Sequence, residues 1–221
     1  MSASGEFSVS PDLADIVRPG LLWWQDATVT EHHTALDTLL AEAEAALRAK
    51  PPADTAMVRV MYKRVGLDPT KTRPSSEALL RRILKGGAIP RINAMVDVIN
   101  WCSVEFQLPY GLYDFAFVRG VPTLRLGRPG EEYAGIRKDT VHVAGRITVA
   151  DDEGPFGNPT SDSARTMVTT ATTDALVIVY APAAFPRPEL ERVLQVTADR
   201  IARVCGGDEL RRATTTICGQ P

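Results

Sequence analysis

The sequence predicts an α/β protein of the α+β type, with helices packed on an antiparallel β core in a single domain. Two observations lead to this prediction. Before Asp114, apolar side chains recur at helical spacing in segments that begin at capping residues and end at glycine or proline. After Asp114, short apolar runs alternate with glycine-rich turns, as strands do. The 221 residues suit one domain, which we expect over residues 7–218 behind a flexible tail at residues 1–6.

The first part of the chain is expected to begin with strands and to continue with helices. In order, the expected elements are strands at 7–9 and 21–24 with a helical turn at 11–17 between them, then helices at 34–48 and 57–65. The first helix places leucines on one face and acidic side chains on the other. The second directs Val58, Met61 and Val65 inward, at the spacing that marks an amphipathic helix.

A third helix is predicted over residues 75–85. Pro74 suits the start of a helix, because its missing N–H has no partner in the first turn anyway. Ser75 or Ser76 is expected to cap the free N–H groups there, and Gly86 ends the helix.

A fourth helix is predicted over residues 93–106, capped by Asn93 and ended before Pro109. Asp97 and Asn100 lie three residues apart, so they share one face of this otherwise apolar helix. Paired polar residues on such a face indicate that it binds a backbone loop or a ligand.

Short strands dominate the rest of the chain. They are expected at 115–118, 122–126, 142–143, 146–150, 166–170, 176–180 and 210–218, with a helix at 188–204 before the last one. The segment 150–162 is polar and rich in glycine and proline, which predicts a long loop of the kind that often carries function.

Basic side chains are concentrated in one part of the chain. The whole chain carries a net charge of −2, yet residues 59–91 hold nine basic and two acidic side chains. A cluster of this kind can follow a phosphate backbone, although surface helices also carry charge simply to face water. The residues that we expect to contact RNA are Lys63, Lys71, Arg73, Arg81, Arg82, Lys85 and Arg91.

Composition argues against several classes of protein. The apolar runs are shorter than the ~20 residues that a membrane span needs, and the start does not resemble a secretory signal. Cys102, Cys205 and Cys218 are an odd number without metal-site spacing. We therefore expect a cytoplasmic protein with reduced thiols, no metal, no cofactor and no membrane partner.

Familiar catalytic motifs are absent from the sequence. It contains no G-x-S-x-G, H-E-x-x-H, phosphate-binding glycine loop or C-x-x-C pair. A serine triad would have to use His142, because His32 and His33 are adjacent near the N-terminus. His142 lies between two valines of a short expected strand and is interpreted as an ordinary strand residue. Motifs alone therefore do not decide whether the chain is an enzyme.

Several segments, taken in order along the chain, carry a resemblance to a known family. They are Pro74–Arg82, Ile92-Asn93, Val96–Asn100 and Leu108–Asp114, continued by Val149–Pro155 and by Asp162–Arg165 with Thr172–Asp174. In this order they resemble the tRNA-editing (B3/B4) domain of the phenylalanyl-tRNA synthetase beta subunit, and its free-standing relatives more than the synthetase itself. The resemblance covers roughly residues 7–206.

The resemblance implies a barrel-like β core and hydrolysis of the ester between a wrong amino acid and the 3′ end of tRNA. An ester is already activated, so such a site needs mainly placement of water and donors to the developing oxyanion. Asn100 matches a pocket residue of the family, and Asp162, Ser163 and Arg165 complete the expected catalytic group. Asp97, Gly111, Asp114, Ser161 and Ile178 are expected in the substrate pocket.

Two of the expected roles have a simpler alternative. Asp162 could hold the substrate ammonium, and Arg165 a phosphate or the amino-acid carbonyl. Equally, Asp162 and Arg165 could form an ion pair that ties down the loop at 150–162.

At two positions the sequence departs from the family pattern. Gly111 stands where the synthetase domain has a histidine, and Ile178 stands where it has the glutamate that recognises the tyrosine hydroxyl. Selection through that hydroxyl is not expected here, because a site discriminates a hydroxyl by hydrogen-bonding it. An apolar or small amino-acid side chain fits Ile178 better.

Three functions remain open from the sequence. The first is trans-acting hydrolysis of mischarged aminoacyl-tRNA, and the second is a non-catalytic tRNA- or RNA-binding module. The third is a binding protein for a free amino acid or a related small molecule. The basic cluster favours tRNA or aminoacyl-tRNA as partner, and DNA is not expected. The amino acid, the tRNA and the oligomeric state do not follow from the sequence.

Overall fold

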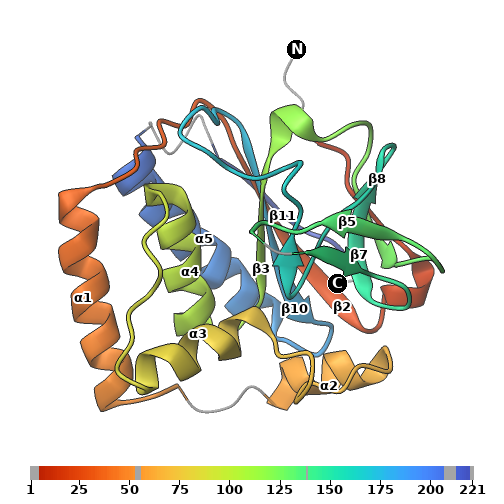
Figure 1. The fold of residues 1–221 in the computed structure, drawn as a ribbon, viewed down its shortest axis with the longest axis horizontal. Helices are drawn as coiled ribbons and strands as arrows, with labels where there is room; N and C mark the ends of the chain where they lie inside the picture. Colours follow the sequence, from red (N-terminus) through yellow and green to blue (C-terminus); the bar gives the residue numbers. More distant parts are fainter. Residues whose placement is uncertain (1–4, 53–55, 138, 207–212, 220–221) are drawn as a thin grey trace.

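The computed structural model describes residues 5–52, 56–137, 139–206 and 213–219. It confirms a mixed α+β fold, in which most of the helices gather on one side and the sheets on the other (Figure 1). Most of the tail expected at residues 1–6 lies outside the described residues, as does the beginning of the strand expected at 210–218.

The described residues contain five α-helices, each within one residue of its predicted ends. They are α1 (Thr34–Ala49), α2 (Ala56–Arg64), α3 (Ser75–Leu84), α4 (Ala94–Phe106) and α5 (Arg187–Cys205). α4 begins as predicted, with the Asn93 side chain accepting the Val96 N–H at 3.0 Å. At α3 the capping prediction is wrong. Pro74 occupies the N-cap position, and the hydroxyls of Ser75 and Ser76 have no hydrogen-bond partner among the described residues.

A four-stranded antiparallel sheet forms the centre of the molecule. Its order is β11-β2-β10-β3, built from β11 (Ala213–Ile217), β2 (Val17–Trp24), β10 (Ala175–Pro182) and β3 (Tyr110–Asp114). Every residue of β10 is buried, as expected of a central strand covered on both faces. On one face the Tyr110 hydroxyl lies 3.0 Å from that of Thr197 in α5.

The remaining strands form two further sheets. The five-stranded one has the order β1-β4-β7-β8-β9, from β1 (Ser8–Val9), β4 (Thr123–Leu126), β7 (Ile147–Asp151), β8 (Gly154–Asn158) and β9 (Ser161–Asp162). The third pairs β5 (Glu132–Ala134) with β6 (Thr140–His142). All pairs are antiparallel except β1 with β4. These sheets are open, so the barrel-like closure that the resemblance implied is not observed among the described residues.

The central sheet contacts the five-stranded sheet through aromatic side chains. Tyr113 of β3 packs edge-on against Phe156 of β8, with ring centroids 4.9 Å apart. Its hydroxyl lies 2.7 Å from that of Tyr180 in β10. On the helical side, Arg200 of α5 stacks over Trp101 of α4 at 3.6 Å.

Three expectations for irregular or extended segments are wrong. The segment 150–162 is no long loop but the β7–β8 hairpin followed by β9. The strand expected at 115–118 is instead the 3₁₀ turn Phe115–Phe117, at whose start the Asp114 carboxylate accepts the Ala116 N–H at 3.0 Å. Residues 166–170 form no strand; the Thr169 N–H is bound instead by the Thr172 hydroxyl at 2.9 Å.

Within the described residues, every helix is too short or too polar to cross a bilayer.

Candidate functional site

A cavity of about 330 Å³ lies where α3, α4, β3 and β9 meet. Much of its wall is apolar and comes from Leu79, Ile92, Val96, Ile99, Leu112, Ile136, Met167 and Val168. Polar side chains complete it: Ser75, Asn100, Ser103, Tyr110, Arg137, Thr160, Ser161 and Asp162. Its volume falls near the lower end of small-molecule sites, about 300–1,000 Å³.

Helix α4 supplies one wall of the cavity through a single face. Val96, Ile99, Asn100 and Ser103 recur at spacings of three and four, so their side chains project together. Asn100 is the polar residue of this face that the sequence singled out. Ser103 instead donates its hydroxyl to the Leu108 carbonyl at 2.8 Å, which ties the end of α4 to the start of β3.

The structure brings three of the predicted site residues to this cavity: Asn100, Ser161 and Asp162. Asn100 comes from α4, whereas Ser161 and Asp162 form the short strand β9. The site therefore joins segments about sixty residues apart. Burial, together with the negative charge of Asp162, raises the pKa of Tyr113, Tyr133 and Tyr180, so these hydroxyls stay protonated beside it.

Two carboxylates predicted in the substrate pocket bind backbone N–H groups and do not line the cavity. Asp97 accepts the Ile92 N–H at 2.8 Å, and burial raises the pKa of this carboxyl. Asp114 accepts the Ala116 N–H and the Thr172 hydroxyl, the latter at 2.6 Å. Both side chains are buried and fix the turns next to α4 and β3.

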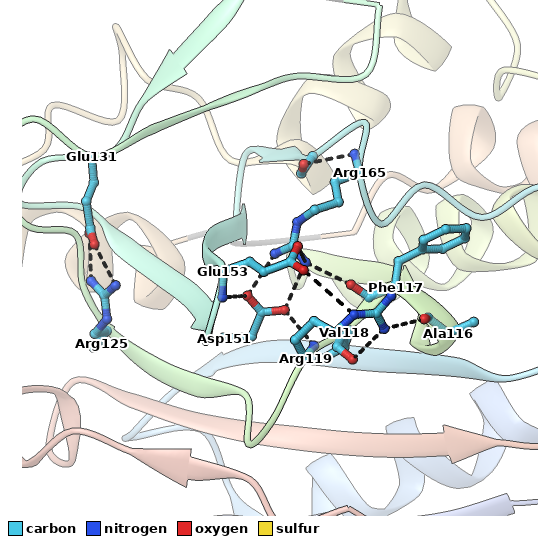
Figure 2. A network of polar contacts seen from close by, with 10 residues as sticks. Ala116, Phe117, Val118, Arg119, Arg125, Glu131, Asp151, Glu153 and Arg165 are labelled. Carbon is cyan, nitrogen blue, oxygen red and sulfur yellow. Dashed lines mark hydrogen bonds and ion pairs between the residues drawn. The ribbon is translucent and has the colours of Figure 1, made fainter.

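Ser163 and Arg165 also lie away from the cavity wall. The Ser163 hydroxyl accepts the Arg165 N–H at 3.0 Å. The Arg165 guanidinium binds Asp151 at 2.8 Å and 3.0 Å and Glu153 at 3.1 Å, as Figure 2 shows. It also donates to the Phe117 carbonyl at 2.8 Å. Arg165 therefore ties the β7–β8 turn to the 3₁₀ turn after β3.

Gly111 and Ile178 are Cα partners across β3 and β10. Neither is among the cavity residues, and Ile178 is fully buried. A Cβ on Gly111 would overlap the Tyr113 hydroxyl, and so would a Cβ on Gly157 of β8. Tyr113 thus fills the space beside both glycines, on the side of the sheet that faces β8.

Several cavity residues were not identified from the sequence. Arg137, at the tip of the β5–β6 hairpin, lines the cavity with a left-handed backbone, φ 51°. Its side chain forms no ion pair among the described residues. Thr160 precedes β9, and Ser75 opens α3. No local pattern marks these residues, since only the tertiary fold brings them to one place.

The basic cluster divides into two groups. Arg73 pairs with Glu77 at 3.3 Å, Arg91 pairs with Asp37 at 3.3 Å, and Arg82 donates to the Ala88 carbonyl at 2.8 Å. The others are exposed and have no ion-pair partner within the described part of the chain: Lys63, Lys71, Arg81 and Lys85. Helix α3 carries Arg81 of this second group, with Lys85 at its C-cap, and also Ser75 and Leu79 of the cavity.

Among the described residues, no group of three histidine, cysteine or acidic side chains is arranged to hold a metal ion.

Comparison with known protein families shows which family the chain belongs to. The model of the B3/4 domain matches residues 57–188. Phenylalanine–tRNA ligase beta subunits match shorter stretches. That of Ralstonia nicotianae is 32% identical over 75 residues, 34% of this chain and 9% of that protein. That of Brucella abortus is 33% identical over 86 residues, 38% of this chain and 11% of that protein. The chain thus matches about a tenth of the length of these relatives.

A solved structure is also similar. It is an N-terminal fragment of the phenylalanyl-tRNA synthetase beta subunit from Pyrococcus horikoshii, 14% identical with a TM-score of 0.46. The match covers 90% of this chain and 48% of that one.

Proposed function

Since the chain belongs to the B3/4 domain family, we propose that it is a trans-acting editing deacylase that hydrolyses mischarged aminoacyl-tRNA. The curated relatives are beta subunits of a tRNA ligase, which supports a role connected with tRNA. A cytoplasmic location, where tRNA is charged, fits this proposal.

The observation that carries the proposal is the composition of the cavity. Its wall is largely apolar, and Asn100, Ser161 and Asp162 supply polar groups from two separate elements. An aminoacyl ester needs both parts: an apolar surface for the amino-acid side chain, and polar groups for the ammonium and the ester.

We assign a role to each of these polar groups. The Asp162 carboxylate binds the substrate ammonium, and the Asn100 amide donates to the ester carbonyl oxygen as it becomes an oxyanion. Ser161 orients the attacking water. Water adds to the carbonyl carbon, the ester C–O bond breaks, and the proton from water ends on the released ribose oxygen. Placement of an activated ester supplies most of the rate in this scheme.

The tRNA part of the substrate binds the exposed basic side chains of the cluster. Lys63, Lys71, Arg81 and Lys85 are exposed and available to phosphates. Because α3 carries part of this surface and part of the cavity wall, tRNA bound along α3 brings its 3′ end toward the cavity. The apolar wall favours an apolar amino acid on that end.

A deacylation assay tests the proposal. Purified protein is incubated with a panel of correctly and incorrectly charged tRNAs, and loss of the ester is followed. We expect the protein to hydrolyse one mischarged species. The variants Asn100→Ala and Asp162→Ala should abolish this turnover. If no charged tRNA is hydrolysed but salt-sensitive tRNA binding persists, the chain is a non-catalytic RNA module. If tRNA binding is absent as well, the cavity serves a free amino acid or a related small molecule.

A further inference from the structure

A closed ring of hydrogen bonds lies behind the β9 wall of the cavity. The Asn158 side-chain oxygen accepts the N–H groups of Thr160 at 2.8 Å and Ser161 at 3.0 Å. Its amide nitrogen donates to the Tyr133 hydroxyl at 2.7 Å. That hydroxyl in turn donates to the Ser161 carbonyl at 2.5 Å. Both side chains are buried, with 3% of Asn158 and 8% of Tyr133 exposed.

The ring acts on a very short element. β9 has two residues, Ser161 and Asp162, and both line the cavity. Pairing with β8 alone would be weak, because two residues provide few ladder hydrogen bonds. Asn158 and Tyr133 add four hydrogen bonds in a buried setting, where such bonds define a single geometry.

We propose that Asn158 and Tyr133 form a clamp, as positioning residues that fix Ser161 and Asp162 in the cavity wall. Neither side chain of the clamp lines the cavity. It acts through the backbone of residues 158–161 and joins the β5 hairpin to the β8–β9 turn. Its catalytic consequence rests on the proposed function, whereas its effect on the turn does not.

The clamp predicts a specific pattern of effects. Tyr133→Phe removes the hydroxyl that accepts from the buried Asn158 amide nitrogen and donates to the Ser161 carbonyl, so both of these hydrogen bonds are lost. We expect about tenfold faster amide exchange in residues 158–162, since one such hydrogen bond corresponds to about a tenfold change in local opening. On the mischarged tRNA we expect about tenfold lower kcat with KM within twofold, because placement of the reacting groups changes and tRNA binding does not.

Hydrogen exchange and kinetics are measured on the same variants. Thr197→Val is the matched control, because it also removes a fully buried hydroxyl, one bound within α5 to the Val193 carbonyl at 2.7 Å rather than to the β8–β9 turn. Should Tyr133→Phe fail to fold, Asn158→Asp replaces it: this variant keeps the oxygen that the turn uses and loses the donor to Tyr133.

The outcomes separate the two proposals. The clamp is supported if exchange in 158–162 rises and kcat falls in the clamp variant, with neither change in Thr197→Val. Unchanged exchange, or faster exchange with unchanged kcat, overturns it. If the unmodified chain hydrolyses no charged tRNA, the proposed function fails, and the exchange comparison alone then decides for or against the clamp.

Discussion

Gly111 of β3 and Ile178 of β10 stand opposite each other as Cα partners in the central sheet. The two positions at which the resemblance suggests a departure from the family pattern are therefore neighbours in space. Both lie outside the cavity wall, and the Tyr113 side chain fills the space beside Gly111. On the Gly111 side, the Tyr113 ring packs against Phe156 at the interface between the two larger sheets.

A side chain at Gly111 should therefore destabilise the fold. Gly111→Ala brings its Cβ onto the Tyr113 hydroxyl, and overpacking of this kind costs about 1–3 kcal/mol. The free energy of unfolding in urea measures the loss. In a Tyr113→Phe background the same change should cost less, because the nearest atom is gone. Equal costs in both backgrounds would contradict this account of the packing.

Replacing Asn100 should affect turnover much more than stability. Asn100→Ala removes one expected oxyanion donor, which lowers kcat by about 10²-fold on the mischarged tRNA. Gln195→Ala is the matched control, since it removes an exposed amide of α5 that is bound to Asp199. A loss of turnover of the same size in both variants would remove Asn100 from the site.

Arg165 should matter for stability. Its partner Asp151 has a fully buried side chain, so Arg165→Met leaves that carboxylate without its guanidinium. We expect a loss of about 2–3 kcal/mol; the usual ~3–5 kcal/mol is reduced because Asp151 also accepts two backbone N–H groups. Arg187→Met breaks an exposed pair and should cost less than about 1 kcal/mol. Denaturant midpoints compare the two variants.

Charge reversal on α3 should weaken tRNA binding in a salt-dependent way. Arg81→Glu with Lys85→Glu removes two exposed cations, and the slope of log K against log salt should fall by about two. Arg203→Glu changes an exposed charge on α5 and serves as the control. Filter binding at several salt concentrations gives the slopes. An unchanged slope in the α3 variant would place the RNA elsewhere.

The buried thiols should resist alkylation in the native protein. Burial raises the pKa of Cys205 to about 12 and also raises the pKa of Cys102. Because only the thiolate reacts, both should be protected from iodoacetamide at pH 8 and modified after unfolding, which mass spectrometry detects. The unfolded chain loses the Cys205 proton from about pH 9 and the folded one near pH 12, so stability should fall across that interval.

The helices could be predicted closely because their signals are local. Asn93 caps α4 through a residue three positions ahead, and the apolar periodicity of α1 and α5 does not depend on distant partners. The prediction of a loop at 150–162 is wrong for the opposite reason. Its polar, glycine-rich composition is typical of a loop. In the structure, pairing of β8 with β7 makes a hairpin, and the turn at Asn158 leads into the short strand β9.

The candidate site was only partly predictable. Asn100, Ser161 and Asp162 could be singled out from the resemblance, and the fold places them at one cavity. Arg137 and Tyr133 could not, because their importance comes from contacts between distant segments. Arg165 shows the converse: a charged residue beside the expected site can serve a turn that the sequence does not reveal.

The central sheet also has a consequence for how the chain folds as it is made. β2 is synthesised early, yet both of its neighbours, β10 and β11, follow more than 150 residues later. The helices α1 to α4 leave the ribosome long before this sheet can form. We therefore expect the apolar β2 strand, with Trp23 and Trp24, to remain unpaired through most of translation and to be a natural target for a nascent-chain chaperone.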